Sequence, residues 1–225
     1  MRRVRFFGFL ARVLGYTFAI KRMEKGEEGA QDKYRFLTDE IPEAEKVIND
    51  EQTHEKDLIA ILDEDRLKYI GSMVLGLSDA LVELTGTLAG LTFALKDTRL
   101  VALSGLITGV SATLSMASSE YLSAKSDGRN DAVKSCAYTG IAYLITVAAM
   151  ILPYLLLPSG AYAAALGIML AVVVSEIAMF SYYISVTQEL KFRSRFIEMA
   201  GISLGVALLA FVIGLLAKQL LGVDV

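Results

Sequence analysis

Four carboxylates lie inside long apolar runs of this chain, where ordinary packing does not require them. Asp79 and Glu83 occur in "LGLSDALVELTGTLAGL", four residues apart, so one face of a helix would carry both. Ionisable groups inside a bilayer cost several kcal/mol and usually mark an ion path or a proton relay. We therefore predict that these two residues belong to an ion path.

The other two intramembrane carboxylates each have a methionine within about one helical turn. Met116 and Glu120 are four residues apart in "SATLSMASSEYLSAKS", and Glu176 precedes Met179 by three residues. A thioether is a soft ligand that favours transition ions over Ca²⁺ or Mg²⁺, which prefer oxygen shells. Both pairs are candidates for the same path, although Glu120 is close enough to the end of its run to extend to the interface instead.

A second candidate site surrounds the single histidine of the chain, in "NDEQTHEKDL". Glu51 precedes His54 by three residues, so both would project from one helix face. A carboxylate and an imidazole can hold a divalent metal, and Glu-x-x-His recurs in di-iron carboxylate bundles. The preceding segment offers Glu24, Glu27 and Glu28 as further ligands. Acidic helices also produce this spacing by chance, so a solvated charged face is the alternative.

Composition separates an acidic segment from a membrane segment. Hydrophobic residues make up 54% of the chain, above the roughly 45–50% of ordinary globular proteins. Fifteen of the 25 Asp and Glu residues fall within residues 24–65. Five later stretches reach the ~20 apolar residues that a spanning helix needs: about 69–95, 100–122, 135–157, 161–186 and 199–218. The fold class is therefore predicted to be all-α, with a bundle of five transmembrane helices.

Basic residues near the span ends give the orientation. A cytoplasmic N-terminus places most of them inside, namely Arg66, Lys68, Lys125, Arg129, Lys134, Lys191, Arg193 and Arg195. Lys96, Arg99 and Lys218 are then outside. We expect a multi-pass protein of the plasma membrane with a cytoplasmic N-terminus and an external C-terminus.

Three segments follow from these observations. Residues 1–20 form a basic amphipathic stretch, expected to be a helix at the membrane surface rather than a cleaved signal, because Arg12 interrupts its apolar middle. Residues 21–65 are expected to form a cytoplasmic hairpin of two helices that turns at Ile41 and Pro42. Residues 66–225 form the membrane domain.

The first two spans resemble the vacuolar iron transporter family, in "GLSDALVELTGTLAG" and "LSMASSEYLSAKS". The resemblance extends over most of residues 66–220. It implies a homodimer whose first spans line a path, with Asp79 and Met116 as metal contacts and Fe²⁺ exchanged for protons. Many members have a glutamate where this chain has Thr108, so Glu83 or Glu120 is expected to supply the missing carboxylate. Some members also have a long acidic hairpin where this chain has only "AKSDGRNDAVK".

Residues 20–65 resemble the first half of a ferritin-like domain of the rubrerythrin type, in "GEEGAQDKY" and "DEQTHEKDL". In that resemblance Glu27, seven residues before Tyr34, is the first ligand, and Glu51 with His54 forms the second motif. One chain supplies half of such a site. The resemblance therefore implies that two hairpins dimerise into a four-helix ferritin-like bundle holding a di-iron site, with Mn²⁺ or Zn²⁺ as other occupants.

These observations predict an exporter of cytosolic Fe²⁺, driven by proton antiport and supplied by the hairpin. Three alternatives remain open: a membrane-anchored ferroxidase without translocation, a Mn²⁺ exporter of the same architecture, and a hairpin that senses metal rather than relays it. The expected partners are lipids, a second copy, metal ions and protons, but not nucleic acid. No G-x-x-x-x-G-K-[ST] motif is present, so the chain itself is not expected to use ATP.

Overall fold

The computed structural model describes residues 15, 18–22, 69–188 and 190–221 of the 225-residue chain. The chain divides into two compact units, Met1–Lys68 with Tyr183–Leu190 and Tyr69–Tyr182 with Lys191–Val225. In the first unit, residues 18–22 are helical and Phe18 stacks on Tyr183 with ring centroids 5.4 Å apart. Most of the expected surface helix, and the whole hairpin apart from residues 21 and 22, are outside the described residues.

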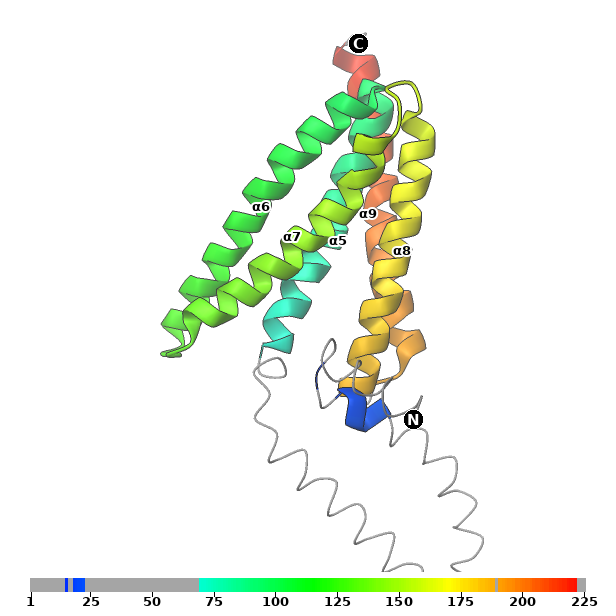
Figure 1. Cartoon of the computed structure of the whole chain (residues 1–225). Helices are drawn as coiled ribbons and strands as arrows, with labels where there is room; N and C mark the ends of the chain where they lie inside the picture. The colour runs from blue at the N-terminus through cyan, green and yellow to red at the C-terminus, as the bar shows by residue number, and fades with distance from the viewer. Residues whose placement is uncertain (1–14, 16–17, 23–68, 189, 222–225) are drawn as a thin grey trace, which may run out of the picture. The chain divides into compact units, whose positions relative to one another are not determined.

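The second unit is a bundle of long helices (Figure 1). They are α5 (Ile70–Leu95), α6 (Thr98–Ser126), α7 (Ala132–Leu156), α8 (Tyr162–Thr187) and α9 (Phe192–Leu221). The last five residues of α8 belong to the first unit. Each is long and apolar enough to cross a membrane, and the described part of the chain contains no strand. The predicted all-α fold with five spans is therefore confirmed.

Helices α6 and α9 extend beyond both ends of the apolar runs from which they were predicted. Helix α6 begins beside Asp97, whose Oδ1 accepts hydrogen bonds from the backbone N–H groups of Arg99 at 2.7 Å and Leu100 at 3.1 Å. It continues to Ser126, past the end of its apolar run at about residue 122, and Gly128 follows with a φ of +70°. Helix ends depend on capping and chain reversal rather than on hydropathy, which explains the difference.

Apolar side chains of four helices form the core of the bundle. The fully buried ones include Leu81, Leu84 and Leu88 of α5, Val147, Met150 and Ile151 of α7, and Met169, Val173 and Ile177 of α8, with Val101 of α6 beside them. Many leucines on the outside are exposed, such as Leu156 at 73%. Exposed leucines are expected on helices whose outer faces contact lipid rather than water.

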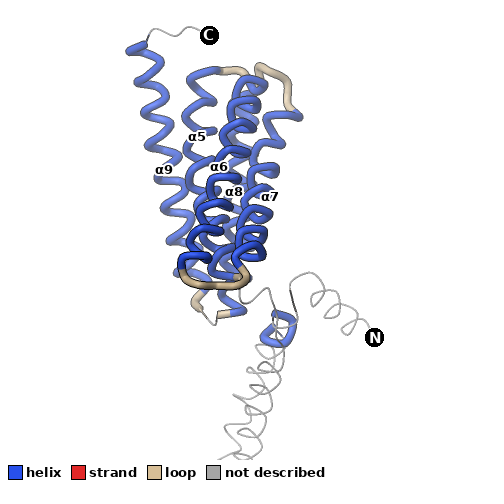
Figure 2. The backbone as a smooth tube through the Cα atoms, turned by 90° about the vertical axis from the view of Figure 1, so that its left-hand side faces the viewer, coloured by secondary structure: helices blue, strands red, loops and turns tan. Residues whose placement is uncertain are grey.

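Helix α5 is central to the contacts of the unit, because it packs against α6, α7 and α9 (Figure 2). Small residues allow α5 and α9 to approach closely: Gly86 and Gly90 on α5 face a stretch of α9 that includes Ala210 and Gly214. A Cβ on Gly90 would be 3.0 Å from the carbonyl oxygen of Ala210, and a Cβ on Gly214 would overlap the carbonyl oxygen of Gly90. This is the small-xxx-small packing of membrane helices, and it fixes the position of the helix that carries Asp79.

Candidate functional site

An open pocket of about 500 Å³ lies between α5 and α6. Two carboxylates from α5 line it, together with a row of small polar and apolar residues and one methionine from α6. The lining residues are Asp79, Glu83, Ile107, Thr108, Ser111, Ala112, Ser115, Met116 and Ser119. Three of the five predicted path residues, Asp79, Glu83 and Met116, therefore share one pocket.

Helical spacing explains why these side chains share the pocket. On α6, Thr108, Ser111, Ser115 and Ser119 recur every three or four residues and form one hydroxyl-bearing face. On α5, the four-residue interval between Asp79 and Glu83 has the same effect. The pocket thus combines carboxylate, hydroxyl and thioether ligands. Asp79 and Glu83 are exposed on the single chain, whereas Met116 is half-buried.

A tyrosine from a third helix fixes one of the carboxylates. The hydroxyl of Tyr143 on α7 donates a 2.9 Å hydrogen bond to Oε2 of Glu83, and the tyrosine itself is completely buried. The bond occupies one carboxylate oxygen on the side of the core. Tyr143 could not be singled out from the sequence, because its apolar run also contains Tyr138 and Tyr154 and nothing in the run distinguishes one tyrosine from the others.

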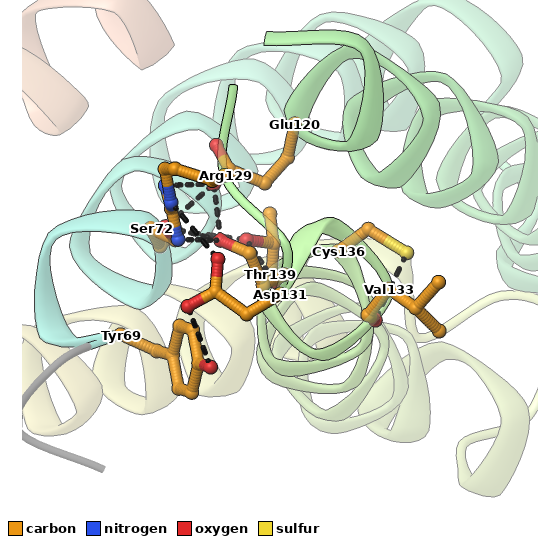
Figure 3. Close-up of polar contacts among 9 residues, drawn as sticks. Tyr69, Ser72, Glu120, Arg129, Asp131, Val133, Cys136 and Thr139 are labelled. Atoms are coloured by element: carbon orange, nitrogen blue, oxygen red, sulfur yellow. Dashed lines mark hydrogen bonds and ion pairs between the residues drawn. The ribbon is translucent and has the colours of Figure 1, made fainter. Parts of the chain in front are cut away.

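Glu120 does not line the pocket, and Figure 3 shows it together with Ser72, Arg129 and Asp131. It is buried, with 8% of its surface exposed. Its Oε1 accepts hydrogen bonds from Oγ of Ser72 at 2.7 Å and from Oγ of Ser135, and Nη1 of Arg129 is 3.7 Å away. A metal ion would have to displace these partners to bind that oxygen.

The contacts around Glu120 extend into a larger polar cluster. Nε of Arg129 is 3.1 Å from Oδ1 of Asp131, and Nη2 donates to Oγ of Ser135 at 3.1 Å. The hydroxyl of Tyr69 donates to Oδ2 of Asp131 at 2.9 Å. We call Tyr69, Ser72, Glu120, Arg129, Asp131 and Ser135 the Glu120 cluster. It joins the start of α5, the end of α6 and the start of α7.

Glu176, on α8, does not line the pocket. Its Oε2 is buried without a hydrogen-bond partner among the described residues. Met179, the methionine paired with it by sequence spacing, is 74% exposed. The carboxylate oxygen and the thioether therefore occupy different surroundings in the single chain, and the structure does not bring Glu176 together with Asp79.

No group of three or more His, Cys, Asp or Glu that could hold a metal ion occurs among the residues that the structure describes. The pocket of one chain offers two carboxylates and one thioether, which would leave room for water or for ligands from another chain. The five predicted hairpin ligands, Glu24, Glu27, Glu28, Glu51 and His54, are outside the described residues. The di-metal site therefore stays a prediction.

Comparison with known families gives one result. Residues 70–130 match the family model described as the VIT family, the vacuolar iron transporters. The match spans α5, α6 and their link to α7, and so includes every pocket residue and Arg129, but neither Tyr143 nor the hairpin. It confirms the resemblance of the first two spans and indicates membrane transport of metal ions. A comparison with curated proteins finds no match.

Proposed function

We propose that this chain carries Fe²⁺ out of the cytosol in exchange for protons, along a path that includes the pocket between α5 and α6. One observation carries the proposal: Asp79, Glu83 and Met116 line the same pocket, on two helices long enough to cross a membrane. The VIT family match over these two helices supports metal ions as the class of cargo.

The ligand types suit a divalent transition ion. Carboxylate and hydroxyl oxygens are hard ligands, whereas the thioether of Met116 is soft, and Ca²⁺ and Mg²⁺ prefer shells made only of oxygen. Fe²⁺ accepts the mixed set. Mn²⁺ is the alternative cargo because it also binds carboxylates, although it benefits less from sulfur. The hydroxyls on α6 would replace part of the ion's water shell along the pocket.

A second copy of the chain is part of the proposal. Asp79 and Glu83 are exposed on the surface of a single chain, within a helix long enough to span the bilayer. A charged side chain facing lipid costs several kcal/mol, so such residues almost always face a protein interior or a water-filled cavity. Two copies facing each other across this surface would cover the carboxylates and double the number of ligands available to one ion.

Protons would compete with the metal for the same oxygens, since ligands must be deprotonated to bind a metal ion. Carboxylates that receive protons from the outer side would release Fe²⁺ there. On the cytoplasmic side, Glu27, Glu51 and His54 of the hairpin, with Glu24 and Glu28 beside them, would collect the ion before it enters the pocket. The orientation rests on the distribution of Lys and Arg at the span ends.

Flux into proteoliposomes tests the proposal. The full chain is reconstituted with an Fe²⁺-sensitive dye on the accepting side and a proton gradient is imposed. Asp79→Asn should reduce Fe²⁺ flux to the level of empty liposomes. The matched control is Glu198→Gln, which changes an exposed carboxylate that pairs with Arg195 at 3.4 Å and does not line the pocket; it should transport normally.

The same preparation ranks the two candidate cargoes and distinguishes a transporter from a ferroxidase. Saturable flux that requires Asp79 and the gradient would support the transporter, and Mn²⁺ competition would rank the two cargoes. Absence of flux above empty liposomes, together with oxygen-dependent formation of Fe³⁺ by the purified chain, would instead support an anchored ferroxidase.

A further inference from the structure

A second pocket, of about 580 Å³, lies where α6 begins and α7 ends. It shares no lining residue with the pocket between α5 and α6. Its wall consists mainly of leucines, including Leu103 and Leu106 from α6 and Leu155 and Leu156 from α7. These four are between 47% and 73% exposed, so an incoming molecule can contact them. The wall is suited to an alkyl chain.

The polar groups at this pocket are few, and most are already bonded. Tyr154 is among the lining residues, but it is buried and its hydroxyl is 2.7 Å from Oγ1 of Thr92 in the core. Asp97 caps α6 through Oδ1, which accepts the backbone N–H groups of Arg99 and Leu100. The guanidinium of Arg99 is different. It is exposed at the pocket, and no carboxylate of the described residues forms an ion pair with it.

Arg99 and the leucines together specify the kind of ligand. An arginine prefers a phosphate or carboxylate, which its planar fork can bind with two hydrogen bonds. A small soluble anion would not use the apolar wall, and a zwitterionic lipid offsets its phosphate with its own cation, so a lipid with a net negative charge suits both features. Arg99 also stands at the end of a membrane-spanning helix, where headgroups lie.

We propose that this pocket is a binding site for one anionic phospholipid, with its phosphate on Arg99 and an acyl chain along the leucines of α6 and α7. The guanidinium can bind a phosphate with two hydrogen bonds while the leucines contact an acyl chain. The lipid would bridge the start of α6 and the end of α7 and so stabilise that end of the α6–α7 pair. The proposal concerns a different surface from the metal pocket and does not depend on transport.

Thermal unfolding of the full chain in an uncharged detergent tests the proposal. Dioleoyl phosphatidylglycerol should raise the unfolding midpoint by about 2–4 °C more than dioleoyl phosphatidylcholine, a shift that ordinary ligand binding gives a protein of this size. Inorganic phosphate alone should give no shift. Arg99→Gln should remove the difference between the two lipids, and Arg99→Lys should retain most of it.

Two further variants make the result specific. Lys96→Gln removes an exposed cation that lies three residues before Arg99 and does not line the pocket. This variant should leave the preference for phosphatidylglycerol unchanged. Leu103→Trp should fill the apolar groove and abolish the shift even with Arg99 present. Equal shifts with both lipids, an equal shift with phosphate, or a preference that survives Arg99→Gln would each overturn the proposal. Should Arg99→Gln fail to fold, Leu103→Trp and Arg99→Lys decide it.

Discussion

The buried hydroxyl of Tyr143 on α7 holds Oε2 of Glu83 on α5 at 2.9 Å. Glu83 is exposed on the surface of the chain, so this bond connects the core of the bundle to the pocket between α5 and α6. Residues that orient a metal-binding carboxylate commonly matter nearly as much as the carboxylate itself. Tyr143 is therefore expected to position Glu83 toward the pocket.

Tyr143→Phe tests this relationship, because it removes the hydroxyl and keeps the ring. If Glu83 binds the cargo, loss of the bond should weaken apparent Fe²⁺ affinity in the flux assay by about 10- to 100-fold. The matched control is Tyr154→Phe on the same helix, which loses a bond to Thr92 away from the pocket. That variant should lower thermal stability without changing affinity. Equal flux curves for Tyr143→Phe and the native chain would show that Glu83 needs no positioning.

Met116 is expected to contribute selectivity. Replacing it by leucine keeps the apolar volume and removes the only sulfur that lines the pocket. Competition between Fe²⁺ and Mg²⁺ should shift toward Mg²⁺ by roughly tenfold, equivalent to about 1.4 kcal/mol. Met150→Leu is the control, because Met150 is fully buried in the core and such volume-conserving changes are well tolerated. Unchanged competition in Met116→Leu would remove the thioether from the ligand set.

Glu120 is expected to act through the Glu120 cluster rather than as a metal ligand. Glu120→Gln should lower the free energy of unfolding by about 1–2 kcal/mol, less than a fully buried ion pair would give, because the Arg129 side chain is 34% exposed. The double variant with Arg129→Gln should cost less than the sum of the two single changes. Additive effects on stability, with flux lost in Glu120→Gln alone, would instead assign Glu120 to the path.

Close packing of α5 and α9 can be tested at glycines. Gly214→Ala places a methyl group against the carbonyl oxygen of Gly90 and should destabilise the protein by about 1–3 kcal/mol. Gly205→Ala, on the same helix with open space around it, should be neutral or stabilising by up to about 1 kcal/mol, since alanine favours the helix. Thermal unfolding compares the two. Similar midpoints would mean that α9 does not pack on α5 at Gly90.

The sequence predicted the parts of this fold that depend on length and local spacing. Five apolar runs gave five helices, and the four-residue interval between Asp79 and Glu83 placed both in one pocket. Met116 of α6 lines the same pocket, and the role as a metal contact that the family resemblance implies for it stays a prediction. The shared direction of Asp79 and Glu83 follows from local spacing, because a helix fixes the relative directions of its own side chains.

The remaining contacts depend on the orientation of each helix about its axis and on the path of the loops between helices. Tyr143 meets Glu83 because of the depth and rotation of α7 against α5, which apolar runs do not encode. Glu120 is engaged by Arg129, which follows the turn at Gly128 and reaches back to α6. Spacing alone therefore grouped Glu120 with Met116, although the structure gives the two side chains different partners.

The role of the acidic segment, which is predicted to form a hairpin, leads to the last prediction. If the hairpin collects Fe²⁺ for the membrane path, removal of residues 24–65 should raise the Fe²⁺ concentration for half-maximal flux and leave the maximal flux nearly unchanged. Glu51→Ala with His54→Ala should reproduce this effect, because these residues carry the predicted metal motif. Asp63→Asn, which removes a carboxylate outside the motif, is the control. A hairpin that senses metal and inhibits the path would give the opposite result, with higher basal flux after removal. The direction of the change therefore distinguishes relay from sensor in one set of flux curves.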